Sequence, residues 1–155
     1  MAIGAAQAIV PQLAALAEAL DAIVARLPEE AFEEPGGEGD WTAAETIGHD
    51  AHARGGLSLA GALAASGRWP ADTPVVVPGV AGPRGASREQ LRARLAASQR
   101  VVERAARSIE GHENDPCPLE HPLVGRLRCG EWLLFAGVHD LMHLEQLHEI
   151  EARHR

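Results

Sequence analysis

Several residue types that specialised classes of protein need are scarce in this chain of 155 residues. Tyrosine and lysine are absent, aromatic residues make up 3% of the chain, and there are two cysteines. Two cysteines cannot build a disulfide framework, and the spacing of Cys117 and Cys129 matches neither a CxxC redox motif nor a zinc knuckle. We expect two free thiols.

The charge and the lack of long apolar runs argue against two kinds of partner. The formal net charge is −8, and no arginine-rich stripe with interleaved aromatics is present, which disfavours nucleic acid. No apolar run reaches the roughly 20 residues that cross a bilayer. Residues Met1 to Val10 also lack the basic start of a signal peptide. We therefore expect a cytoplasmic protein that binds neither nucleic acid nor membrane.

Abundant alanine and a hydrophobic content of 46% favour helices packed around one core. Two helix starts are marked by capping boxes, in which each of two residues three apart accepts, through its side chain, the backbone N–H of the other. The two boxes are Thr42 with Glu45 and Ser87 with Gln90. Pro11 allows the first helix either to begin there or to be kinked there. The predicted helices run from about Ala5 to Leu27, from Thr42 to about Ala65, from Ser87 to about Glu110, and from near Gly130 to the C-terminus.

Two proline- and glycine-rich stretches, 67–86 and 112–129, separate the later helices. Connections of this length are uncommon inside a compact domain and usually serve a function or are disordered. For residues 67–86 we favour a lid or a dimer-contact loop. The predicted fold is all-α: a single domain, 1–155, forming a four-helix bundle with long connections between helices 2 and 3 and between helices 3 and 4. The order of the helices in space stays open.

The most specific local feature is a histidine pair, His139 and His143, on the last predicted helix. Residues four apart lie one turn apart on the same face, so two imidazoles can reach one ion. The rest of that face is largely apolar and points toward the core: Trp132, Phe135, Ala136, Gln146, Leu147 and Ile150. Two neutral imidazoles buried in a bundle need binding partners, and a single metal ion can be the partner of both.

His49 on the second helix can bring a third imidazole to the same point of the core. Three protein ligands leave a coordination position for water or substrate, as in catalytic metal sites. His52, three residues further on, is the rival ligand, although the spacing favours His49; His52 otherwise lines the site or faces solvent. Glu45 can accept an imidazole N–H, although its capping box is the better-supported role. Trp132 is expected to help enclose the metal pocket.

A zinc-protease interpretation of His139-Asp140-Leu141-Met142-His143 fails. That motif carries Glu as its general base, and Asp is one carbon shorter. The chain also ends at Arg155, which leaves little room for a further ligand downstream. The remaining histidines receive no role: His112, His121, His148 and His154.

The motifs together resemble those of the DinB-like (DinB/YfiT) helical proteins. The resemblance is carried by Trp41-Thr42, Glu45 and His49, then His121-Pro122-Leu123-Val124-Gly125, Glu131-Trp132, His139-x-x-x-His143 and Gln146. It implies a four-helix bundle with a three-histidine metal site formed by His49, His139 and His143. It also implies a tendency to form homodimers and, for the characterised relatives, thiol-dependent transfer or isomerisation.

Two functions remain open. The first is a metal-dependent enzyme, a thiol transferase or a hydrolase, in which a divalent ion (Zn, Ni or Fe) activates a water or a low-molecular-weight thiol toward a small-molecule substrate. The second is a non-catalytic, dimeric metal-binding bundle with a structural or stress-related role. A fourth protein ligand from Glu45 or His52 would favour the second.

Overall fold

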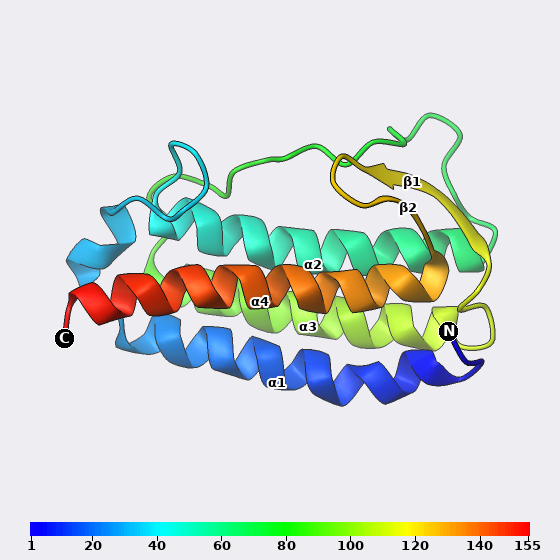
Figure 1. Cartoon of the computed structure of the whole chain (residues 1–155), viewed down its shortest axis with the longest axis horizontal. Helices are drawn as coiled ribbons and strands as arrows, with labels where there is room; N and C mark the ends of the chain where they lie inside the picture. The colour runs from blue at the N-terminus through cyan, green and yellow to red at the C-terminus, as the bar shows by residue number, and fades with distance from the viewer.

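The computed structural model describes residues 1–155 and is a bundle of four long helices with a small sheet at one end (Figure 1). The prediction of an all-α four-helix bundle is confirmed; the sheet is additional. The elements are α1 (Ala5–Arg26), a 3-10 helix (Glu29–Glu33), α2 (Ala43–Ala65), α3 (Arg88–Ile109), β1 (Pro116–His121), β2 (Gly125–Arg128) and α4 (Cys129–Arg153).

The predicted helix starts are confirmed in detail. Thr42 and Glu45 form the first capping box, and Ser87 and Gln90 form the second. Helix α1 begins before Pro11 and runs through it. By length and composition alone α1 is apolar enough to cross a membrane, with a mean hydropathy of 1.6 over 18 residues. Here it forms one side of the bundle, packed against α3 and α4.

The helices run up, down, down and up. In Figure 1, α1 and α4 run in one direction and α2 and α3 in the other. Helix α2 packs on α3 and α4, and α1 packs on the same two helices, so α1 and α2 are diagonal. Because α2 and α3 are parallel neighbours, the chain must return along a helix of 23 residues, about 35 Å, before α3 begins. That return explains the long connection 66–87.

Residues 112–129, predicted to be a connection, contain a hairpin. Strand β1 pairs with β2 in antiparallel fashion, and Val76 of the long connection makes a parallel bridge to Glu120. Pro116 and Pro118 led us to expect a loop. Their side chains are exposed while Cys117 and Leu119 between them are buried, which is the alternation of a strand with one face on the core. The two cysteines are free, as expected, and both are buried.

A buried polar layer crosses the middle of the bundle and separates two hydrophobic clusters. One cluster lies around Leu13, Val102 and Trp132, the other around Leu20, Leu95 and Leu147. The layer contains fully or almost fully buried charged and polar side chains from α2, α3 and α4: Asp50, Arg54, Ser98, His139, Asp140 and His143. Since buried charge is costly unless it is paired, this layer is where a function is expected.

Candidate metal centre

Three imidazoles meet in the polar layer. His49 comes from α2, and His139 and His143 come from successive turns of α4. The Nε2 atoms of His49 and His143 each lie 3.2 Å from Nε2 of His139. The ligand atoms of the three residues all lie within 4.8 Å of one another. His143 and His139 are buried, and His49 is half-buried at the edge of the cluster.

The outer nitrogen of each ring has an oxygen acceptor of its own. Nδ1 of His49 lies 2.7 Å from the Val80 carbonyl, and Nδ1 of His139 lies 3.0 Å from Oδ1 of Asp50. Nδ1 of His143 lies 2.8 Å from Oε1 of Gln146. With Nδ1 donating in each neutral ring, all three Nε2 lone pairs face one another and no proton lies between them.

This donor set fits a metal ion. Nitrogens bound tetrahedrally at about 2.0–2.1 Å from zinc are about 3.3 Å apart, close to the two 3.2 Å separations here. Metal-bound histidines characteristically donate their other N–H to a carboxylate or carbonyl, as all three rings do. Burial is the main cause that lowers the pKa of each of the three imidazoles and so favours the neutral, metal-binding form.

A buried ionic network stands behind His139. Asp140 accepts from Nε of Arg54 at 2.9 and 3.1 Å, and the guanidinium also donates to the Leu13 carbonyl. Burial and the neighbouring charge of Asp50 raise the pKa of Asp140 to about 8. Burial likewise raises the pKa of Asp50, whose Oδ2 has no donor partner. The two acids and one guanidinium therefore form a compact ionisable unit, and each acid is next to a metal ligand in the sequence.

The long connection holds His49 in place. Gly82 N donates to the Glu45 carbonyl at 2.9 Å, and a Cβ on Gly82 would lie 2.7 Å from Cα of Gly48. The backbone therefore approaches α2 closely only because both positions are glycine. Val77 N donates to the Glu120 carbonyl at 2.8 Å. Residues 75–82, called the strap below, thus connect β1 to α2 beside His49.

Of the residues predicted to lie beside the ligands, some contact a ligand imidazole and others do not. Gln146 contacts His143, with Oε1 2.8 Å from Nδ1. Glu45 does not contact an imidazole: its carboxylate accepts from Thr42 N and pairs with Arg84. His52 is exposed and outside the cluster. Trp132 is fully buried and reaches the site only through Phe135, with the two rings 6.0 Å apart.

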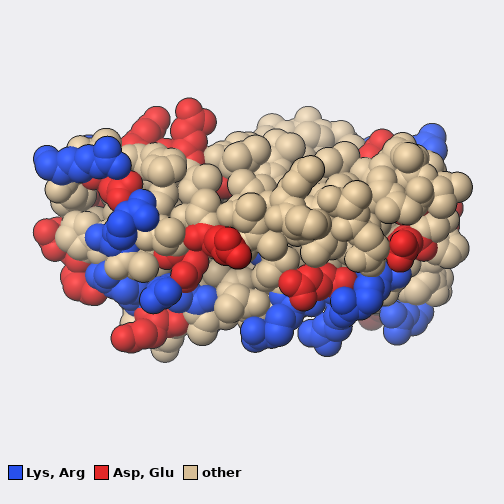
Figure 2. Space-filling view, turned by 90° about the horizontal axis from the view of Figure 1, so that it is seen from below, with Lys and Arg blue, Asp and Glu red and all other residues tan.

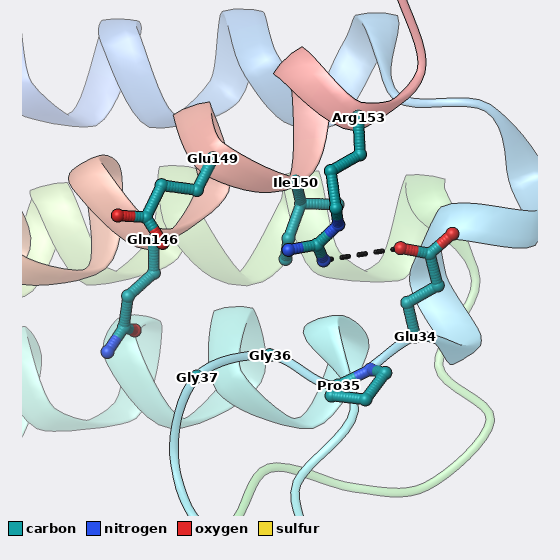
Figure 3. Close-up of a pocket in the computed structure, with 8 residues that line it drawn as sticks. All are labelled: Glu34, Pro35, Gly36, Gly37, Gln146, Glu149, Ile150 and Arg153. Atoms are coloured by element: carbon teal, nitrogen blue, oxygen red, sulfur yellow. Dashed lines mark hydrogen bonds and ion pairs between the residues drawn. The ribbon is translucent and has the colours of Figure 1, made fainter.

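An open groove of about 320 Å³ adjoins Gln146 (Figure 3). It lies between the last turns of α4 and the segment Glu34–Gly37, and the Arg153–Glu34 ion pair closes one side of it. A Cβ on Gly37 would lie 2.9 Å from the Gln146 side chain, so this segment holds Gln146 against His143. The groove approaches the metal site through Gln146 and contains none of the three histidines.

Four functional candidates were absent from the sequence-based site. Asp50, Arg54 and Asp140 are candidates because they are charged groups buried beside the ligands. The Val80 carbonyl is a candidate because it contacts His49. The signal available for Asp50 and Arg54 was two charges four residues apart on a helix rich in alanine and glycine. No side-chain pattern marks a backbone carbonyl in a loop. The rejection of Asp140 as a protease-type base agrees with its pairing to Arg54.

Comparison with known proteins identifies the family. Searches of curated proteins and of solved structures gave no match. The sequence model of the DinB superfamily matches residues 12–147, which include all four long helices in whole or in large part and all three clustered histidines. The chain belongs to the DinB superfamily.

Proposed function

We propose that this protein is a metal-dependent enzyme in which His49, His139 and His143 hold one divalent ion. The observation that carries the proposal is the convergence of three Nε2 lone pairs, each set by an acceptor on the opposite nitrogen. A bound ion would supply Lewis acidity and would lower the pKa of a water or thiol in its open position. Zinc, nickel and iron all suit three imidazoles.

Three features favour catalysis over a purely structural ion. The cluster offers three protein ligands, whereas structural zinc sites are normally closed by four. Glu45 and His52, the alternative fourth ligands, are engaged elsewhere or exposed. His49 is only half-buried, which gives a small molecule a route to the site. We propose transfer or hydrolysis of a small molecule in the cytoplasm, with a low-molecular-weight thiol or water as the activated group.

The first test is elemental analysis of the purified wild type and of the His139→Ala/His143→Ala variant. We expect about one metal ion per wild-type chain and a loss in the variant. The metal that is found is then used to screen thiol transfer and ester or amide hydrolysis. Wild type that takes up no zinc, nickel or iron would sink the proposal. Metal uptake without turnover would favour the non-catalytic alternative.

We also propose that the protein forms a homodimer through an uncharged face of α1 and α4. Four apolar side chains of α4 are exposed on one side, Leu134, Val138, Leu141 and Met142. Figure 2, seen from below and so from the side of α1, shows a broad area without charged residues. Copies with a net charge of −8 repel one another least where neither carries charge. Sedimentation of wild type and Leu141→Glu tests this: a wild-type monomer contradicts it.

A further inference from the structure

His121, which received no role from the sequence, is linked to the metal centre through the Phe135 ring. It is the last residue of β1, and its half-buried ring packs edge to face on Phe135, with centroids 4.9 Å apart. The Phe135 ring is 6.4 Å from that of His139. Burial, and then the charge of His139, lower the pKa of His121. The fourth imidazole is therefore near the metal ligands without being one of them.

The hydrogen bonds of His121 determine its protonation pattern. Its Nδ1 lies 3.1 Å from the Leu123 backbone N–H and so accepts from it. A neutral ring with an accepting Nδ1 carries its proton on Nε2. That Nε2–H has no partner in the protein, although the ring is half-buried. His121 thus offers one free donor on a ring that packs against Phe135, and the Phe135 ring lies 6.4 Å from that of His139.

The strap fixes His121 relative to His49. In the strap, Val77 N donates to the carbonyl of Glu120, the residue before His121. Three residues further along the strap, the Val80 carbonyl accepts from His49. One short segment therefore sets the positions of a metal ligand and of the free donor. Such positioning is what a site needs in order to bind a molecule at two points.

We propose that His121 is a substrate-binding residue whose Nε2–H donates to an oxygen of a molecule coordinated at the open position of the metal. The inference rests on the proposed metal site. It assigns the ligand two chemical features, a metal-binding head such as a thiol and a carbonyl or carboxylate oxygen a few bonds away. A neutral imidazole suits this role because it donates without adding charge. A site built around such a donor rejects analogues that lack the acceptor.

The experiment measures thiol binding to the cobalt(II)-loaded protein by the sulfur-to-cobalt absorption band. The probes are mercaptoacetate, 3-mercaptopropionate and 4-mercaptobutyrate, each compared with the alkanethiol of equal chain length. The variants are His121→Phe, which keeps an aromatic ring against Phe135 without the donor, and His121→Gln, which keeps an N–H. Cobalt content and helical circular dichroism are measured for every protein.

We expect wild type to bind at least one carboxylate thiol about tenfold or more tightly than its alkanethiol, in line with a charge-assisted hydrogen bond. His121→Phe should lose that preference with cobalt content unchanged, and His121→Gln should keep part of it. Equal preferences in wild type and His121→Phe, with thiols binding to both, would overturn the role of His121 alone. Failure of the wild type to bind cobalt or any thiol would overturn the proposed function as well.

Discussion

Asp50 orients His139 by accepting its Nδ1–H at 3.0 Å in a fully buried position. We expect Asp50→Ala to lower metal affinity about 10- to 100-fold, because the imidazole loses the acceptor that sets its tautomer. Asp50→Asn is the matched control, since an amide oxygen can still accept, and it should lose much less. Competition with a chelating dye measures both affinities. Wild-type affinity in Asp50→Ala would refute the role of this contact.

Metal binding should persist to a lower pH than ordinary histidines allow. Burial lowers the pKa of His49, His139 and His143 below the usual value of about 6.5. Because these pKa values are lowered, the three imidazoles are neutral and able to bind metal above pH about 6.5. They lose that form, and the stability that depends on it, only as the pH falls through their pKa values in the folded protein. We expect half-release of metal below pH 6.5 in dialysis from pH 8 to pH 4.5; half-release above that pH would contradict this.

At the scale of elements, the strap is predicted to support the metal site through one close approach. A Cβ at position 82 would lie 2.6 Å from the Glu45 carbonyl oxygen, so Gly82→Ala should push the strap off α2 and move Val80 away from His49. We expect roughly a tenfold loss of metal affinity, the low end for loss of such a contact. Gly79→Ala is the control because open space surrounds that position. Equal affinities in the two variants would show that the strap has no part in the site.

The helices were predictable because their signals are local. Capping boxes and three- and four-residue apolar spacing act within one turn, so the starts of α2 and α3 followed from sequence. The hairpin did not, because Pro116 and Pro118 indicate a loop unless a partner covers Cys117 and Leu119. The lid or dimer-contact prediction for residues 67–86 stays a prediction; what the structure adds is the strap's contact with His49 and β1.

For the whole molecule, Arg54 joins all four helices. From α2 it bonds Asp140 of α4, the Leu13 carbonyl of α1, and Ser98 and Gln99 of α3. Arg54→Met should lower the free energy of unfolding by about 3–5 kcal/mol, because the buried acid of Asp140 would lose its ion-pair and hydrogen-bond partner. Urea denaturation measures the loss.

The matched variant is Arg54→Met/Asp140→Leu, which removes both charges. It should recover much of the stability, since replacing a buried pair by apolar groups is often neutral. A double variant no more stable than Arg54→Met alone would show that other contacts of Arg54, and not the buried charge, account for the loss.

The sequence by itself determined the family, the four helices and the histidine pair on α4, because each depends on local spacing. It pointed to His49 through the family motif, yet it left the tertiary structure to decide which acceptors orient the three rings. The acceptors come from three separate places: Asp50 on α2, Gln146 on α4 and the carbonyl of Val80 in the strap. The pairing of Arg54 with Asp140, 86 residues away, and the place of His121 beside Phe135 likewise depend on how the helices and the hairpin pack, which no local pattern encodes.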